Sequence, residues 1–285
     1  MRVRGLRLAV WSSPPIEDRP PLVCINGGML YDHSMLWPAL SPLARTRQVI
    51  LYDQRGRRAS EAPADPLAPP IDDDAADVGA LRRSLGIRRW DVLGHSWGGG
   101  IAMLGAAGDP GGTRRLVLVD AVGPTSAWMP ELRRNALARL HGEQHDALAV
   151  LDEAALGQPD PDLHSRHARA VYPAWFADPD LAAYFTPPRA TSLTGAAALA
   201  RLRSAGYDWR SRLRALSVPT LVIHGEQDPL PRSVAEELTA LLPAARRVFV
   251  PTSGHMPFWE APARFFVLVE AFLDAPSPGA VSLPP

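Results

Sequence analysis

The chain has 285 residues, with 30 basic and 30 acidic side chains and a formal net charge of zero at pH 7. This length fits one large domain, or a core domain that carries an insertion. Its 46% hydrophobic and 21% charged residues are ordinary for a globular protein, and the zero net charge argues against binding to nucleic acid or to an anionic membrane through bulk charge.

The start of the chain and its single cysteine bear on its location. The segment MRVRGLRLAVW has an apolar part too short and too interrupted for a signal peptide, and no apolar stretch is long enough to cross a bilayer. Cys24 has no partner for an intrachain disulfide or a multi-cysteine metal site, and in the run PLVCIN it is expected to be a small buried side chain. We therefore expect a soluble, cytoplasmic protein with no membrane partner.

Apolar runs that favour β-strands recur along the chain, with helical patterns between most of them. The candidate strands span residues 6–11, 21–26, 48–53, 90–95, 115–120, 219–225 and 246–251. Several are apolar at consecutive positions, which is typical of strands covered on both faces of a parallel sheet. The alternation of strands and helices predicts an α/β fold with a doubly wound, mostly parallel sheet.

The clearest helical pattern covers residues 72–86, where Val78, Leu81 and Leu85 lie on one face. Three consecutive aspartates begin this pattern. Carboxylates at a helix N-terminus satisfy free N–H groups and the helix dipole, and we prefer this interpretation to an acidic metal site.

The alternation stops between residues 124 and 210. This segment is rich in Ala, Arg, Pro and aromatic residues, and it contains no good strand. We expect a helical cap at 124–210, a core formed by 1–123 and 211–277, and a flexible tail at 278–285. The cap aromatics could line a pocket or form a small core of their own, and both interpretations stay open for Trp128, Tyr172, Trp175, Phe176, Tyr184 and Phe185.

The run DVLGHSWGGGIAML at 91–104 places a glycine–x–serine–x–glycine pattern between a predicted strand and an apolar helical run. In this setting the serine lies on a sharp, strained turn from strand to helix. Gly94 and Gly98 are required because side chains there would collide across the bend. The following helix points its N-terminus at Ser96 and favours negative charge that develops beside it. Ser96 is therefore the candidate nucleophile.

A serine nucleophile requires a general base and an acid that orients the base. Asp228 follows the predicted strand PTLVIHG, and His255 lies in the loop after the next strand. The order serine, acid, histidine and the placement past strand ends are those expected of such a site in an open α/β sheet. Asp120, which ends the run RLVLVD, is a competing acid. We favour Asp228 because its loop lies nearest the strand that precedes His255, and we expect Asp120 to brace the turn into the cap.

An acyl-transfer site also needs N–H donors that bind an oxyanion. One donor is expected from Trp97, the residue after the nucleophile. The other is expected from the NGGM loop after the run PLVCI, where Gly27 and Gly28 let the backbone approach an acyl carbon. We assign this donor to Gly28, although the same residues also fit a simple glycine turn.

Together these motifs resemble the α/β-hydrolase superfamily over nearly the whole chain. Within it, YDQRG at 52–56 and HSWGG at 95–99 look most like the proline iminopeptidase-like branch, whose members carry a helical cap between the sixth and seventh main strands. The resemblance implies a catalytic triad of Ser96, His255 and Asp228 that acts on a small-molecule substrate without a cofactor.

The chain departs from that family's pattern at several positions. Asn26 and Met29 replace the usual histidine and proline around the double glycine, and RGRRAS lacks a glycine of the usual turn. Some aminopeptidase members place an acid directly after the catalytic aspartate to bind the substrate's amine, and here that position is Pro229. Other cap acids could meet an ammonium group, namely Glu131, Glu143, Asp178 and Asp208.

These residues leave several functions open. We favour a serine hydrolase that cleaves a small carboxylic ester or amide through an acyl-enzyme on Ser96. The alternatives are a proline iminopeptidase-like aminopeptidase, a cofactor-free perhydrolase, and a carbon–carbon bond hydrolase, because one triad serves all of these reactions. A non-catalytic protein of this fold would bind a small molecule under its cap. Such proteins often lack a triad member, whereas this chain has all three.

The other histidines are expected in structural roles. His141 and His145 lie four residues apart, but a zinc-protease helix needs a glutamate after the first histidine, and here that residue is Gly142. His164 and His167 are expected at the surface of the cap, so no metal site is predicted.

Four polar residues near the predicted strand ends are expected to support the fold. His95 and His224 flank strand ends and are expected to pack or to form hydrogen bonds. Asp53 and Arg55 of the YDQRG motif are expected to form an ion pair that braces the loop near the site.

Overall fold

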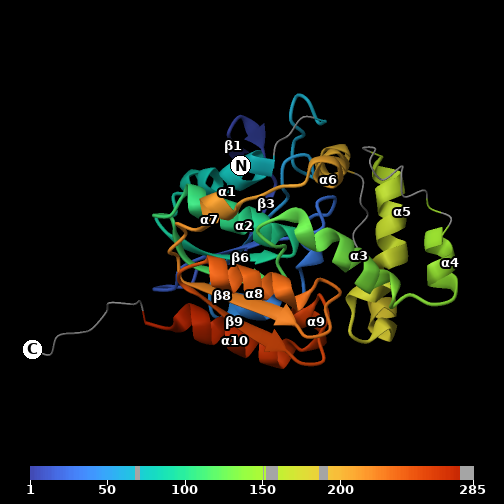
Figure 1. Ribbon diagram of the computed structural model, residues 1–285. Helices are drawn as coiled ribbons and strands as arrows, with labels where there is room; N and C mark the ends of the chain where they lie inside the picture. Colours follow the sequence, from blue (N-terminus) through green and yellow to red (C-terminus); the bar gives the residue numbers. More distant parts are fainter. Residues whose placement is uncertain (68–70, 150, 152–159, 186–191, 277–285) are drawn as a thin grey trace, which may run out of the picture.

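Figure 1 shows the computed structural model, which describes residues 1–67, 71–149, 151, 160–185 and 192–276. Helices surround a central sheet, and a further group of helices lies to the right of it in this view. The tail expected at 278–285 falls outside the described residues. In the described part of the chain, no helix is both long and apolar enough to cross a membrane.

The sheet has seven strands in the order β3-β5-β4-β6-β7-β8-β9. In that order they are Val10–Ser12, Val49–Tyr52, Leu22–Ile25, Trp90–His95, Thr113–Val119, Thr220–Gly225 and Ala245–Val250. All neighbouring pairs are parallel except β3 and β5. The predicted α/β fold with a mostly parallel sheet is therefore confirmed.

The strands form at the apolar runs because the central strands are covered on both faces. Every residue of β4, β5, β6 and β8 is buried, and Cys24 in β4 is a buried side chain as predicted. The predicted strand 6–11 is divided into two. Leu6–Arg7 (β2) pairs with Arg2–Val3 (β1) in a separate hairpin, while β3 joins the main sheet.

Right-handed crossovers determine which helices share a face of the sheet. From β5 to β9 each connection steps in one direction along the sheet, so the connecting helices share a face. These helices are α1 (Ile71–Ser84), α2 (Trp97–Gly108), α7 (Arg210–Leu213) and α8 (Arg232–Leu241). The step from β4 to β5 runs the other way, and its turn η2 (Ser41–Arg45) packs against the last helix, α10 (Pro262–Asp274).

Helices also fill the described part of the segment between β7 and β8. They are η3 (Ser126–Trp128), α3 (Met129–Leu137), α4 (Glu143–Ala149), α5 (Pro161–Val171), η5 (Tyr172–Trp175), η6 (Pro179–Tyr184) and α6 (Leu193–Ala205). A β-bridge between Thr125 and Asp208 joins the two ends of the segment, and the Trp209 N–H donates to the Pro124 carbonyl at 2.8 Å. The segment therefore leaves and re-enters the core at one place, and Figure 1 shows α3, α4 and α5 beside the carboxyl ends of the strands.

The acidic first turn of α1 does more than stabilise a helix end. Asp74 is buried and forms a bidentate ion pair with Arg57, with N···O distances of 3.0 and 3.1 Å. The prediction of an ion pair between Asp53 and Arg55 is wrong. Arg55 pairs instead with Asp77, through hydrogen bonds of 2.6 and 2.8 Å.

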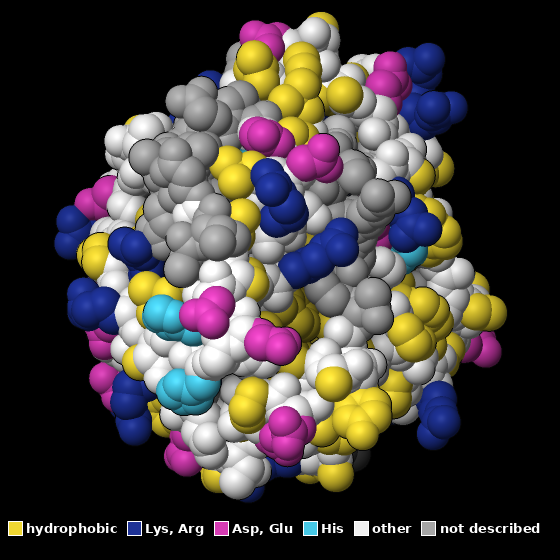
Figure 2. Space-filling view, turned by 90° about the vertical axis from the view of Figure 1, so that its right-hand side faces the viewer, with side chains coloured by type: hydrophobic (Ala, Val, Ile, Leu, Met, Phe, Trp, Pro, Cys, Tyr) yellow, Lys and Arg dark blue, Asp and Glu magenta, His cyan; other side chains and the backbone are white. Residues whose placement is uncertain are grey.

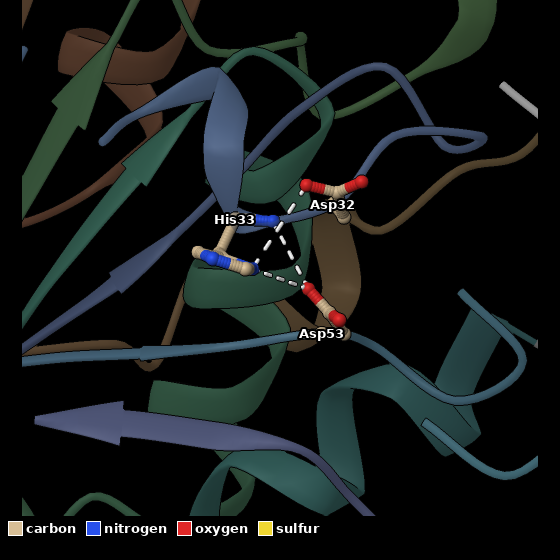
Figure 3. A group of neighbouring side chains, drawn as sticks. All are labelled: Asp32, His33 and Asp53. Atoms are coloured by element: carbon tan, nitrogen blue, oxygen red, sulfur yellow. Dashed lines mark hydrogen bonds and ion pairs between the residues drawn. The ribbon is translucent and has the colours of Figure 1, made fainter. Parts of the chain in front are cut away.

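Asp53 instead binds the turn η1 (His33–Met35). One of its oxygens accepts the backbone N–H of His33 at 3.1 Å and lies 2.8 Å from Nδ1 of the same residue. Figure 3 shows this contact with Asp32 beside it. The other oxygen accepts the N–H of Ala59 at 3.2 Å. Protein donors thus occupy both oxygens of Asp53, and the cluster braces the turn that follows β5.

Candidate active site

Ser96 lies in the turn between β6 and α2. Its backbone has φ 54° and ψ −121°, a conformation that a residue with a side chain adopts only where the surroundings enforce it. A Cβ atom on Gly94 would lie 2.4 Å from the Gly98 carbonyl oxygen, and one on Gly98 would lie 2.2 Å from the carbonyl oxygen of Ile25. The predicted need for both glycines is therefore confirmed.

Gly98→Ala should destabilise the protein, because its methyl group would meet the backbone of β4 in the centre of the sheet. Overpacking of this kind costs about 1–3 kcal/mol, and we expect a lower urea midpoint of unfolding. Gly108→Ala is the matched control in the same helix, where no atom lies within 4 Å of the added carbon. This variant should keep or raise the midpoint. Equal midpoints would contradict this account of the turn.

His255 and Asp228 form a buried pair near this turn. Asp228 lies in the loop after β8, and His255 lies in the loop after β9. Nδ1 of His255 is 2.8 Å from Oδ2 of Asp228, and the Leu230 N–H donates to the other oxygen at 2.8 Å. The structure therefore brings together the histidine and the acid that the sequence analysis paired.

The partner of Nδ1 determines the tautomer of His255. A carboxylate only accepts hydrogen bonds, so Nδ1 carries the ring proton and donates it to Asp228. Burial lowers the pKa of His255, so the ring is neutral at pH 7 and Nε2 has a free lone pair. Among the hydrogen bonds of the described residues, none joins Ser96 to His255. Catalytic bonds of this type often tighten only when the substrate is present.

Core and cap both position the backbone of His255. Its N–H donates to the carbonyl oxygen of Trp175 in η5 at 2.7 Å, and the two rings lie 4.4 Å apart. Its carbonyl oxygen accepts a bond of 2.8 Å from Nε2 of His95 at the end of β6. The hydrogen-bonding role predicted for His95 is therefore confirmed, and this bond ties the His255 loop to the strand that precedes Ser96.

Glu260 is a positioning residue that the sequence analysis missed. It ends the short helix α9 (Pro257–Glu260), five residues after His255. Its carboxylate accepts the backbone N–H groups of Gly254 and Met256 at 2.9 and 3.2 Å, on the two sides of His255. It also accepts the N–H of Ala177 in the cap at 2.6 Å. A sequence signal existed, since an acid close behind a candidate catalytic histidine can bind the N–H groups of its loop.

The two glycines after β4 lie close to Ser96. A Cβ atom on Gly27 would lie 2.6 Å from Cβ of Ser96, and Gly28 has φ +76° with no room for a side chain beside Tyr31. Trp97 is the first residue of α2, where N–H groups have no partner within the helix. Two backbone segments therefore lie close to Ser96, one at Trp97 and one in the glycine loop that contains Gly28. The absence of side chains at the two glycines leaves room for a substrate to approach.

Buried side chains fix the loop that carries these glycines. Asn26 donates to the carbonyl oxygen of Tyr31 at 3.1 Å, and Gln54 donates to the carbonyl oxygen of Asn26 at 2.8 Å. Arg57, which is paired with a buried acid of α1, donates to the carbonyl oxygen of Met29 at 2.8 Å. Asn26 and the RGRRAS segment depart from the pattern of the proline iminopeptidase-like branch. The structure shows that their side chains hold the glycine loop in place.

One cavity of about 980 Å³ connects these residues with the cap. Ser96, His255, Gly28 and Trp97 all lie on its wall. The sequence left open whether the cap aromatics line a pocket or form a small core. Trp128, Tyr172 and Trp175 line the cavity, whereas Phe176 and Phe185 pack on Tyr172. Tyr184 does neither and is exposed.

The charged residues of the cap are not arranged as the sequence analysis expected. The four acids considered for an ammonium group are all exposed, and none of them lines the cavity: Glu131, Glu143, Asp178 and Asp208. His164 and His167 in α5 do line it. The prediction that both histidines lie at the surface is therefore wrong for His164, which is buried. Figure 2 looks onto the cap and shows acidic and histidine side chains interspersed with hydrophobic ones on its outer face.

A family model described as alpha/beta hydrolase fold matches residues 20–262. Among curated proteins, the chain is similar to a proline iminopeptidase of Lactobacillus delbrueckii subsp. lactis, with 29% identity over 273 residues and 90% of each chain covered. It is also similar to 2-hydroxymuconate semialdehyde hydrolase of Pseudomonas putida, with 32% identity over 241 residues, 81% of this chain and 78% of that protein.

Two solved structures agree with this result. The enol-lactonase from Burkholderia xenovorans LB400 has a TM-score of 0.71 and 25% identity, with 96% of this chain and 98% of that chain covered. The proline iminopeptidase of Mycobacterium smegmatis has a TM-score of 0.70 and 24% identity, with 95% and 96% covered. Since the family model spans most of the sequence, from the strand before the glycine loop to the helix after His255, this chain belongs to the alpha/beta hydrolase fold family.

Proposed function

We propose that the protein is a serine hydrolase that cleaves the acyl bond of a small, uncharged carboxylic ester or amide through an acyl-enzyme on Ser96. The observation that carries this proposal is the buried His255–Asp228 bond beside a strained serine, with Ser96 and His255 on the wall of one cavity. The three side chains follow β6, β8 and β9 at the carboxyl edge of the sheet, where open α/β sheets place their sites.

The proposed reaction begins when Nε2 of His255 takes the hydroxyl proton of Ser96. The Ser96 Oγ atom forms a bond to the carbonyl carbon, and the electron pair of the double bond moves to oxygen. The N–H groups of Gly28 and Trp97 bind this oxyanion. When the double bond re-forms, the bond to the leaving group breaks and His255 gives it the proton. A water molecule then repeats these steps on the acyl-enzyme and releases the acid, while Asp228 holds the imidazole in place.

The composition of the cavity wall argues against a positively charged substrate, since Arg133 and Arg203 are among its lining residues. Among the described residues, no aspartate or glutamate lines the cavity, and most of its lining is apolar. A substrate ammonium group would therefore enter a low-dielectric site without a described carboxylate partner, which is costly. Pro229 also stands where some aminopeptidases place an acid, and its carbonyl oxygen is bound by Asn135 at 2.9 Å. These features favour acyl esters over peptides with a free amino terminus.

We expect p-nitrophenyl butyrate to be turned over with a higher kcat/KM than proline p-nitroanilide. Because esters are intrinsically more reactive than anilides, N-acetylproline p-nitroanilide is the matched control: it has the same scissile bond without the positive charge. The blocked anilide should be cleaved at least as well as the free one, since removing the charge removes its burial cost. A clear preference for the free prolyl anilide, lost on acetylation, would establish the aminopeptidase instead.

A further inference from the structure

Asp120 lies at the end of β7, directly beside the acid of the proposed triad. It is fully buried and has φ 44°, so its backbone is held in an unusual conformation. One carboxyl oxygen accepts the N–H of Gly225 at 2.8 Å, so the residue braces the end of β8 and not the turn into the cap. Polar side-chain atoms of Asp120, His224 and Asp228 all lie within 4.8 Å of one another.

His224 lies on one side of Asp120, and its tautomer determines whether it offers Asp120 a hydrogen-bond donor or an acceptor. Nε2 of His224 bonds the carbonyl oxygen of Leu230 at 3.0 Å, and a carbonyl oxygen only accepts, so Nε2 carries the ring proton. Burial lowers the pKa of His224 to about 4, so the ring is neutral at pH 7. Nδ1 therefore presents a lone pair to Asp120 at 3.5 Å. This atom accepts a hydrogen bond and donates none.

The Asp228 carboxyl lies on another side, with its ligand oxygen within 4.8 Å of that of Asp120. Both acids are buried, and two negative charges this close repel each other strongly, so the cluster favours a proton on one of them. Oδ2 of Asp120 receives no N–H or O–H donor among the described residues. Asp120 thus faces acceptors on the sides of His224 and Asp228, and in the described part of the chain the Gly225 N–H is the one donor to its carboxyl group.

Burial raises the pKa of Asp228 as well, but Asp228 is much better supplied than Asp120 with groups that stabilise a negative charge. It accepts the Leu230 N–H at 2.8 Å and the Nδ1–H of His255 at 2.8 Å, and it interacts with the positive charge of Arg139. The negative charge of Glu260 acts on both acids and disfavours a second carboxylate in this cluster.

We propose that Asp120 is a protonated positioning residue, which donates its carboxyl proton to Asp228 and so fixes the carboxylate that orients His255. Burial, together with the negative charge of Asp228, raises the pKa of Asp120 well above its usual range. The proton stays between the two acids and is not transferred during turnover. The protonation itself does not depend on the proposed function, whereas the positioning role rests on it.

The first test detects the proton directly. Infrared spectra at neutral pH should contain the carbonyl stretching band of a buried, protonated carboxylic acid that shifts in D₂O. The band should disappear in Asp120→Asn, which keeps a hydrogen-bond donor towards Asp228 but has no carboxyl group. If the wild-type and variant spectra do not differ in this band, Asp120 is ionised and the proposal is wrong.

The second test follows stability with pH. Folding raises the pKa of Asp120 above its unfolded value of about 3.9, so the protonated form stabilises the fold fully below that pH. This contribution is lost as the pH rises towards the folded-state pKa. Asp120→Asn does not titrate, so its Tm relative to wild type should rise between about pH 5 and pH 8, by roughly 2–4 °C or more. A constant difference in Tm over this range would overturn the proposal.

The third test separates a donor from a space-filling group. Asp120→Asn should keep kcat/KM for p-nitrophenyl butyrate within roughly threefold of wild type at pH 7, because the amide still donates to Asp228. Asp120→Ala removes the donor and should lower kcat/KM roughly 10- to 100-fold. Equal losses in the two variants would show that no donated bond is needed. If both proton tests succeed while Ser96→Ala remains active, the proposed function fails and the protonation of Asp120 stands.

Discussion

Ser96→Ala should lower kcat for p-nitrophenyl butyrate by about 10⁶-fold, to the rate that the oxyanion donors and substrate binding alone can supply. The loss is this large because no acyl-enzyme can form without the Ser96 oxygen. The variant should remain folded, since Oγ of Ser96 makes no hydrogen bond among the described residues and removing it leaves no unpaired partner. Initial rates, together with circular dichroism of the purified variant, measure both effects.

Ser217→Ala is the matched control for that substitution. It makes the same chemical change at an exposed serine before β8, at the opposite edge of the sheet from the candidate site. Its kcat should stay at the wild-type value. If folded Ser96→Ala kept most of its turnover, Ser96 would not be the nucleophile.

Asp228→Asn should reduce kcat by roughly 10³-fold or more relative to Asp120→Asn, because an amide at position 228 would favour the wrong tautomer of His255. The structure supports this order, since Asp228 and not Asp120 contacts Nδ1 of His255, at 2.8 Å. Turnover of p-nitrophenyl butyrate by the two variants, measured at the same pH, gives the comparison.

The two substitutions are well matched, because both replace a buried aspartate by an isosteric amide within one cluster. A general loss of packing would affect them similarly. Equal losses, or a larger loss in Asp120→Asn, would contradict the assignment of Asp228 as the acid that orients His255.

The fold could be predicted from the sequence because the signals for its elements are local. Buried parallel strands appear as apolar runs, and β4, β5, β6 and β8 all form where such runs stand. The turn at Ser96 could be predicted from two glycines, because only glycine fits where the backbone of α2 meets those of β6, at Gly94, and β4, at Gly98. The division of residues 6–11 was missed, since a hairpin with Arg2–Val3 has no separate apolar signal.

The contacts that Arg57 and Glu260 make across the fold could not be predicted, because they join distant segments. The place of Glu260 close behind His255 was a signal only for its bonds within that loop. Arg57 meets a carbonyl oxygen 28 residues earlier in the chain, and Glu260 bonds a cap residue 83 positions away. The expected pairing of Asp53 with Arg55 failed for the same reason. The two residues are close in sequence, but the fold brings other partners closer to each of them in space. His164 was predicted at the surface because the sequence of α5 does not show which face of the helix borders the cavity.

Labelling with a fluorophosphonate probe tests the central claim, that Ser96 is an activated nucleophile, most directly. Trypsin cleaves after Arg89 and Arg114, and the peptide of residues 90–114 contains a single serine, Ser96. The account predicts that the wild-type protein carries the phosphonate on this peptide with loss of esterase activity, and that folded Ser96→Ala carries none. An active wild-type protein that stays unlabelled, or that is inactivated by a label on another peptide, would contradict it.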